Sequence, residues 1–102
     1  MSAYHLIWRF EVDKACRAGF EDAYGPNGLW VDLFRQGTGY LGTELLRDAG
    51  GADRYVTVDH WTSRDAYQAF RAQYAAVYSA LDLRCQTLTA KETFLGEGDS
   101  AD

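Results

Sequence analysis

The segment RYVTVDHWTSRDAYQAF (Arg54–Phe70) decides the expected fold, because its pattern changes from that of a strand to that of a helix. Its first half alternates between two faces, which predicts a strand over Arg54–Trp61. One face holds Val56 and Val58, and the other holds Tyr55, Thr57, Asp59 and Trp61. Thr62 or Ser63 can then cap a helix, which is expected to run from about Ser63 to Leu81.

The N-terminal part of the chain repeats this order of strand, cap and helix. YHLIWRFEV (Tyr4–Val12) alternates and predicts a strand, and Asp13 can cap the helix that follows. The helical pattern is interrupted by GPNG (Gly25–Gly28), because proline lacks a backbone donor, and it then resumes to Phe34. The sequence therefore predicts a broken first helix.

Two further strands complete the expected fold. YLGTELLR (Tyr40–Arg47) and AKETFL (Ala90–Leu95) have strand character, and the glycines of DAGGAD suit a hairpin turn. The order β-α-β-β-α-β predicts an α+β fold, a ferredoxin-like sandwich. We expect a single domain over residues 1–96, followed by a flexible acidic tail over residues 97–102.

Both faces of this sheet are expected to carry large apolar groups, although the helices can cover only one of them. The strands over Tyr4–Val12 and Arg54–Trp61 are apolar on both sides. An exposed apolar sheet face favours a homodimer in which two sheets pack together.

Length and charge exclude several classes of function. A chain of 102 residues builds one small core, and its formal charge of −5, with no basic cluster, argues against nucleic acid as a partner. The apolar runs are too short for a membrane span, and the start lacks the basic region of a signal peptide. Cys16 and Cys85 lack a metal-type spacing and predict two buried, reduced thiols in a cytoplasmic protein.

Three other chemical signals are weak. Gly37, Gly39 and Gly42 form a GxGxxG pattern, but here it follows a helix and enters a strand, which is the wrong context for a nucleotide site. His5 and His60 lie on different predicted strands without the spacing of metal ligands, so no metal site is expected. No Ser-His-Asp or Cys-His arrangement is visible.

Trp61 and Tyr67 have two interpretations. The structural one makes Tyr67 a core aromatic with a satisfied hydroxyl, Trp61 a closure of the core, and His60 a hydrogen-bonded strand residue. The functional one brings an indole, a phenol and an imidazole to a pocket between helix and sheet. Such a pocket suits a flat aromatic substrate, with the phenol as proton donor or relay.

The piece HWTSRDAY (His60–Tyr67) is a strand that ends in Trp, then a Ser cap, then a helix that begins Ala-Tyr. With the strand over Tyr4–Val12 and the interrupted first helix, it resembles the antibiotic biosynthesis monooxygenase family. The resemblance covers nearly the whole chain. It implies dimers of ferredoxin-like subunits that form a dimeric α+β barrel.

One branch of that family oxidises phenolic or quinol-type compounds to quinones with dioxygen and without a cofactor. Trp61 and Tyr67 match two positions that contact substrate in this branch, where the Tyr takes part in proton transfer. Thr57 stands where the branch has an Asn; it can hydrogen-bond but lacks the amide. Arg71 is the nearest match to the branch's helix arginine, but it is offset.

The resemblance therefore implies a homodimeric, cofactor-independent monooxygenase for a hydroxylated aromatic or quinol-type small molecule, with dioxygen as co-substrate. The expected catalytic residues are Tyr67, Trp61 and His60. The expected substrate-binding residues are Thr57, His5, Trp30 and Phe70. His60 and His5 are also candidates for a base that generates a phenolate.

Two alternatives remain open. The same dimer can be a non-catalytic small-molecule-binding or interaction domain, because a fold does not fix a function. Haem degradation is disfavoured, because the branch that performs it needs a histidine in the latter half of the second helix. AYQAFRAQYAAVYSAL (residues 66–81) has none.

Overall fold

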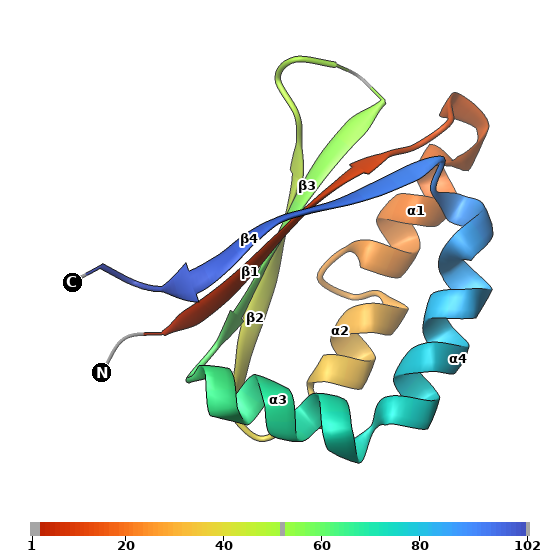
Figure 1. The fold of residues 1–102 in the computed structure, drawn as a ribbon. Helices are drawn as coiled ribbons and strands as arrows, with labels where there is room; N and C mark the ends of the chain where they lie inside the picture. Colours follow the sequence, from red (N-terminus) through yellow and green to blue (C-terminus); the bar gives the residue numbers. More distant parts are fainter. Residues whose placement is uncertain (1–2, 52, 102) are drawn as a thin grey trace.

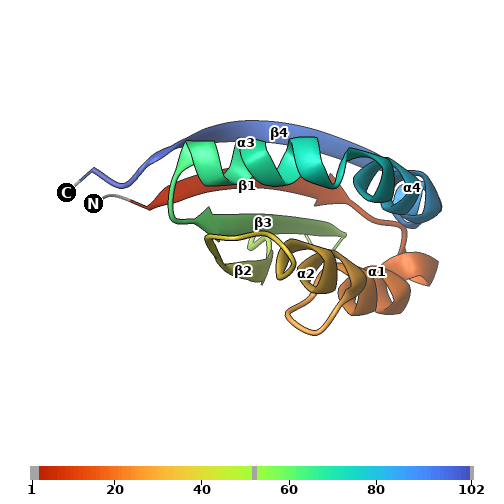
Figure 2. The same ribbon diagram turned by 90° about the horizontal axis from the view of Figure 1, so that it is seen from below.

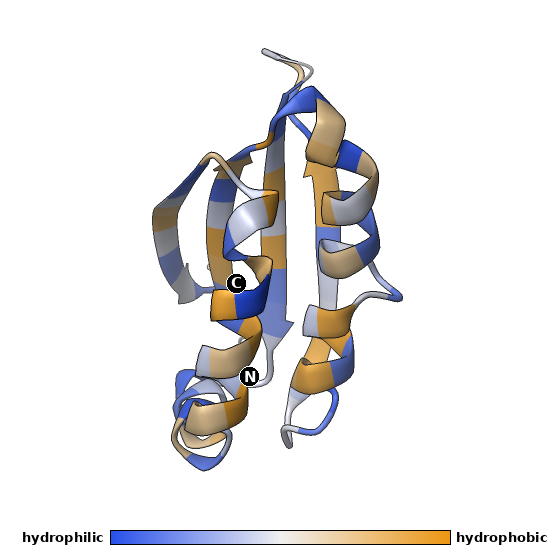
Figure 3. Ribbon diagram, turned by 90° about the vertical axis from the view of Figure 1, so that its right-hand side faces the viewer, coloured by the Kyte–Doolittle hydropathy of each residue, from blue (hydrophilic) through white to orange (hydrophobic). Residues whose placement is uncertain are grey.

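A computed structural model describes residues 3–51 and 53–101 of the chain. One four-stranded antiparallel sheet carries all its α-helices on the same face (Figures 1 and 3). The elements in chain order are β1 (Tyr4–Glu11), η1 (Lys14–Cys16), α1 (Arg17–Tyr24), α2 (Leu29–Phe34), β2 (Tyr40–Arg47), β3 (Arg54–Trp61), α3 (Arg64–Gln73), α4 (Ala75–Cys85), η2 (Gln86–Leu88) and β4 (Lys91–Asp99). The predicted α+β, ferredoxin-like architecture is confirmed.

The sheet has the strand order β2-β3-β1-β4, so β1 and β3 are its central strands. Their register places Tyr4 opposite Trp61 and Glu11 opposite Arg54. This antiparallel pairing brings the start of β1 next to the point where β3 leads into α3. The N-terminal and middle parts of the chain therefore meet at one corner of the sheet (Figure 1).

The prediction of a flexible tail over residues 97–102 is wrong for residues 97–99, which belong to the last strand. We expected the last strand to end at Leu95, but β4 continues to Asp99, which pairs with Tyr4. The strand continues because β1 offers a free edge along its full length, and the Tyr4 hydroxyl donates a hydrogen bond to Glu97. Asp102, the last residue of the expected tail, lies outside the described residues.

The second predicted helix is two helices in the structure. Tyr74 separates α3 from α4 with φ −110° and ψ 25°. Its side chain packs against the Phe70 ring with the centroids 5.4 Å apart, and its hydroxyl donates to the Gln36 carbonyl. Consequently α3 lies along one end of the sheet while α4 runs beside α2 (Figures 1 and 2).

The break in the first helix is confirmed. α1 ends at Tyr24 and α2 begins at Leu29, and the Gly28 amide donates to the Gly25 carbonyl at 2.9 Å. Asp13 precedes a short 3-10 turn instead of an α-helix, and its side chain makes no capping bond. No helix in the described ranges is long and apolar enough to cross a membrane.

The core lies between the sheet and the helices. Its most deeply buried large side chains are Trp61, Tyr55, Phe20 and Phe70. The register places Ile7, Leu46, Val56 and Val58 together on the other face of the sheet, which no helix of the structure covers (Figure 1). Val77 of α4 points away from this core and is 53% exposed.

Candidate active site

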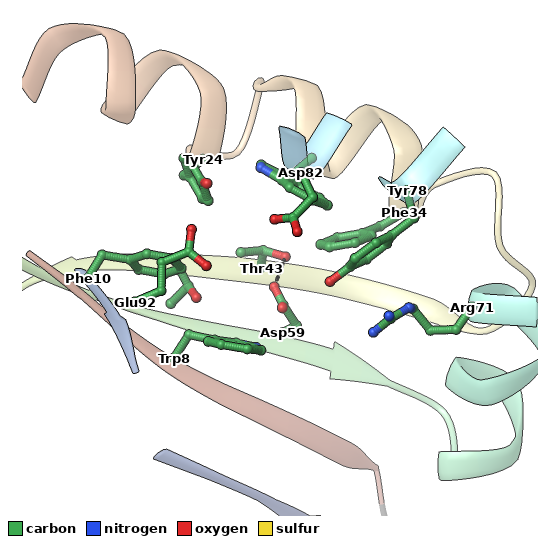
Figure 4. A pocket seen from close by; sticks show the side chains of 12 residues that line it. Trp8, Phe10, Tyr24, Phe34, Thr43, Asp59, Arg71, Tyr78, Asp82 and Glu92 are labelled. Atoms are coloured by element: carbon green, nitrogen blue, oxygen red, sulfur yellow. Dashed lines mark hydrogen bonds between the residues drawn. The ribbon is translucent and has the colours of Figure 1, made fainter. Parts of the chain in front are cut away.

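A cavity of about 220 Å³ lies between the sheet and the helices (Figure 4). Its aromatic walls come from both layers: Trp8, Phe10, Tyr24, Trp30, Phe34 and Tyr78. Its polar lining residues are Thr43, Thr57, Asp59, Arg71, Asp82 and Glu92. A mostly aromatic enclosure with a few converging polar groups is typical of a small-molecule site.

The sheet side of the cavity carries an ordered chain of polar groups. The Thr43 hydroxyl donates to Asp59 Oδ1 at 2.7 Å, and the Tyr40 hydroxyl lies 2.6 Å from Thr43 Oγ1. Asp59 is only 9% exposed. Burial raises the pKa of the Asp59 carboxyl to about 6, against the opposing effects of the Thr43 hydrogen bond and the charge of His60.

The helix side of the cavity carries one cation, Arg71 of α3. Its guanidinium carbon lies 3.8 Å from the centre of the Tyr78 ring, and its Nη1 donates to the Tyr67 hydroxyl at 2.8 Å. Tyr67 is half-buried and does not itself line the cavity. Arg71 therefore connects the phenol of Tyr67 to the cavity.

Trp61 and Phe70 belong to the packed core beside the cavity. Trp61 is 0% exposed, and its ring meets the Tyr67 ring edge-on with the centroids 5.5 Å apart. Phe70 packs on Trp61 at 5.0 Å. These contacts leave no room for a substrate between the Trp61 and Tyr67 rings, and neither residue lines the cavity.

His5 and His60 lie on the opposite face of the sheet from the cavity. The two Nδ1 atoms are 2.6 Å apart, so one ring donates to the other. The chain of contacts continues from His60 to Glu44 at 3.1 Å and from His5 to Ser100 at 2.6 Å. Neither histidine can reach a ligand in this cavity.

Of the residues expected from the sequence, Thr57 and Trp30 line the cavity. The most informative residue that the sequence reasoning missed is Asp59. It shares a strand face with Thr57 and Trp61, and an acidic residue on an otherwise buried face was the available signal. Arg71, Tyr78, Asp82 and Glu92 face the cavity from α3, α4 and β4. Their positions depend on how α3 and α4 pack against the sheet, which the sequence pattern does not show.

Asp59, Asp82 and Glu92 all face the cavity. Within the described part of the chain, however, no group of three or more His, Cys, Asp or Glu side chains is arranged to hold a metal ion. The Glu92 side chain is exposed overall, but partial desolvation of its carboxyl, and then the charge of Asp82, raise its pKa. The carboxylates at this site therefore oppose one another's ionisation.

The sequence matches the family model for antibiotic biosynthesis monooxygenases over residues 3–76. A variant of SnoaB, a cofactor-independent oxygenase from Streptomyces nogalater, has a similar fold, with a TM-score of 0.76 and 24% identity over 100% of this chain and 96% of that one. The haem-degrader MhuD from Mycobacterium tuberculosis, with two haems in its active site, has a TM-score of 0.70 and 25% identity over 97% of this chain and 96% of that one.

A curated relative gives a shorter match. A mycobilin-producing haem oxygenase from Mycobacterium tuberculosis is 50% identical over 32 residues, which are 31% of this chain and 30% of that protein. The aligned part thus spans less than a third of the curated relative's length.

Proposed function

Because this chain belongs to the antibiotic biosynthesis monooxygenase family, we propose that it is a cofactor-independent monooxygenase that oxidises a hydroxylated aromatic or quinol-type small molecule with dioxygen. The single observation that carries this proposal is the aromatic-walled cavity, with a buried carboxylate on its sheet side and a guanidinium on its helix side. The aromatic walls suit a flat ring, and the two charged groups suit the ionisation of its hydroxyl.

The reaction balances without a further reductant. A phenol loses its hydroxyl proton, and the resulting phenolate is electron-rich enough to reduce dioxygen. The O–O bond breaks, one oxygen atom displaces a ring hydrogen and becomes the second quinone carbonyl, and the other oxygen leaves as water with the hydroxyl proton and the displaced ring proton. The substrate supplies all four electrons, so the protein has to bind the ring, exclude bulk water and handle protons.

The side chains have different roles in this proposal. Arg71 stabilises the phenolate through its charge, and Tyr67 holds the Arg71 guanidinium in place by accepting its 2.8 Å hydrogen bond. Trp61 supports the Tyr67 ring from the core, and Thr57 contributes a hydroxyl to the cavity wall. Phe70 contributes through its packing on Trp61.

The cavity also limits the size of the substrate. Its volume of about 220 Å³ is below the roughly 300–1,000 Å³ usual for ligand pockets. A compound of two or three fused rings with a hydroxyl group is therefore a better match than a macrocycle.

The oligomeric state and the cellular location also belong to the proposal. The uncovered sheet face carries Ile7, Leu46, Val56 and Val58 beside polar residues such as Arg9 and Glu44, and these apolar side chains support a homodimer that packs sheet against sheet. The free thiols of Cys16 and Cys85 support a cytoplasmic location, because thiols persist in a reducing compartment.

Haem degradation is the second candidate, supported by the 50% identity to the haem oxygenase over 32 residues. Against it, α3 and α4 contain no histidine, and Tyr78, Arg71 and Asp82 face the cavity from these helices. The small cavity also argues for a ligand smaller than haem. Titration with haem separates the two candidates. We expect no shifted Soret band at one haem per chain, and the appearance of such a band would favour haem degradation.

Oxygen uptake tests the main proposal. We expect consumption of dioxygen with one or more members of a panel of naphthols, anthrones and hydroquinones. Tyr67→Phe and Trp61→Phe should each lower the rate about tenfold or more, because each disturbs the support of Arg71. Tyr74→Phe, a tyrosine of the same helical layer outside the cavity lining, is the matched control and should keep the rate.

Two results would contradict these assignments. Unchanged uptake in both Tyr67→Phe and Trp61→Phe would remove these residues from the site. Absence of uptake with every compound, together with saturable binding of a naphthol, would favour the non-catalytic binding domain.

A further inference from the structure

Asp59 lies in the middle of the sheet, in an environment that ordinarily excludes a carboxylate. It projects from the central strand β3 into the cavity and is almost fully buried (Figure 4). Among the described residues, the salt bridges join Arg35 to Asp32, Arg47 to Glu21 and His60 to Glu44, and none involves Asp59. An ionisable group that is buried without a salt-bridge partner is a candidate for chemistry.

The hydrogen bonds around Asp59 hold one of its oxygens in place. The Thr43 hydroxyl has a single proton, and this proton is donated to Asp59 Oδ1. The Tyr40 hydroxyl must therefore be the donor in its 2.6 Å contact with Thr43 Oγ1. This ordered relay fixes the carboxylate orientation and leaves Oδ2 as the acceptor available to a ligand.

We propose that Asp59 is the general base that removes the hydroxyl proton of the substrate in the cavity. This inference rests on the proposed function, and it assigns the residue that performs the first step of the proposed oxidation. The substrate O–H bond breaks, its electron pair stays on the oxygen as a phenolate, and the proton moves to Asp59 Oδ2. The same proton later moves to the reduced oxygen that leaves as water, which restores the carboxylate.

The surroundings of Asp59 suit this role. Its pKa of about 6 keeps it ionised at neutral pH, yet makes it a better proton acceptor than an exposed aspartate. Arg71, on the helix side of the same cavity, can stabilise the phenolate that forms. A base on the sheet side and a cation on the helix side are therefore available to one ring.

The other titratable groups near the cavity are less suited to be the base. Those that face it, or act on Asp59 from the packed elements, are Tyr24, Tyr40, His60, Arg71, Tyr78, Asp82 and Glu92. Asp82 and Glu92 are exposed at the rim, so water competes for their oxygens. His60 lies on the opposite face and hydrogen-bonds His5. Burial raises the pKa of Tyr24 and Tyr78, which keeps both phenols protonated.

The pH profile of oxygen uptake tests Asp59 directly. For the wild-type protein, we expect kcat/KM to rise with pH and to level off above a midpoint near 6. In Asp59→Asn, kcat/KM should fall about 10²- to 10⁴-fold, and the rise near this midpoint should disappear. Asp65→Asn, with the same change on the exposed first turn of α3, should keep both rate and midpoint.

The acidity of the substrate gives a second signature that a purely structural role would not produce. Naphthols with electron-withdrawing groups ionise in solution without help. The loss in Asp59→Asn should therefore shrink as the substrate hydroxyl becomes more acidic. An equal loss for all substrates, or an unchanged midpoint in Asp59→Asn, would overturn the assignment of Asp59 as base.

A binding measurement separates failure of this inference from failure of the proposed function. If the wild-type protein consumes no dioxygen with any compound, the proposed function fails, but binding still tests Asp59. At pH 7.5, we expect the wild-type protein to prefer 1-naphthol over its methyl ether about tenfold, because the free hydroxyl donates to a carboxylate. The preference should drop several-fold in Asp59→Asn, and an equal preference in both proteins would remove Asp59 from the site.

Discussion

At the residue scale, the carboxylate proposed as the base, Asp59, is expected to lower the stability of the folded protein. A carboxylate that is almost fully buried is costly to the folded state, and the Thr43 hydrogen bond offsets only part of that cost. Proteins keep such groups where chemistry needs them, and the removal of such a group often stabilises the fold.

We therefore predict that Asp59→Asn stabilises the protein at pH 7.5 and has little effect at pH 4. The unfolded carboxyl ionises near pH 3.9, whereas the folded one ionises at about 6. The wild-type protein thus loses stability as pH rises through this interval, by on the order of 3 kcal/mol. Urea denaturation of both proteins at the two pH values checks this, and a pH-independent difference between them would contradict it.

Arg71 carries a second prediction at this scale. Arg71→Gln removes the positive charge that lines the cavity, together with the contact over the Tyr78 ring. We expect binding of an anionic naphtholate to weaken about tenfold or more, by calorimetry at a pH where the ligand is ionised. Arg64→Gln, an exposed residue of the same helix, is the matched control and should bind normally. Equal weakening in both variants would show that the net charge of the protein, and not a contact in the cavity, determines binding of the anion.

The sequence allowed some of these residues to be placed and not others. The alternation of β3 put Thr57, Asp59 and Trp61 on one face, and the structure confirms that face as buried. The sequence could not show that His60 faces away from the cavity, because only the docked helices define where the cavity is. Nor could it show that the ring of Tyr67 packs against Trp61 without space between them.

At the element scale, the connection from α2 to β2 controls where α3 begins. Gly39 has φ +94°, and its carbonyl accepts a hydrogen bond from the Thr62 amide at 2.7 Å. A side chain at this position would place Cβ 2.4 Å from Thr62 Oγ1 and 2.9 Å from the Ala66 Cβ. The glycine is thus required both by its backbone angle and by the close approach of α3.

Gly39→Ala is accordingly predicted to destabilise the protein by about 2 kcal/mol or more. Denaturant unfolding monitored by tryptophan fluorescence measures the effect. Gly50→Ala is the control, since its Cβ would meet only ordinary contacts, the closest at 3.5 Å from Asp48 Oδ1, and the change should stay within about 0.5 kcal/mol. Equal stability of the two variants would count against a strained position at Gly39.

Element boundaries were predictable where a residue type enforces them. Pro26 and its flanking glycines marked the break between α1 and α2, and Ser63 marked the start of α3, where its hydroxyl accepts from the Ala66 amide at 3.0 Å. The break at Tyr74 has no such marker, because tyrosine is compatible with a helix. The extension of β4 depends on a free edge of β1, which a local pattern cannot reveal.

At the scale of the whole molecule, the uncovered sheet face predicts the oligomeric state. We expect light scattering at micromolar concentration to give a dimer for the wild-type protein and a monomer for Val58→Asp, because a buried charge would oppose sheet packing. Val77→Asp introduces the same group at an exposed site on α4 and should remain dimeric. A monomeric wild-type protein would contradict the sheet-against-sheet arrangement.

The cavity draws its walls from Trp8 near the beginning of the chain to Glu92 near its end. During synthesis, Trp8 leaves the ribosome long before Glu92, and β1 keeps an unpaired edge until β4 arrives beside it. A partly translated chain therefore has no complete binding site, and its central strand is open to pairing with other chains. The risk of aggregation therefore stays high until β4, the last strand, has paired with β1.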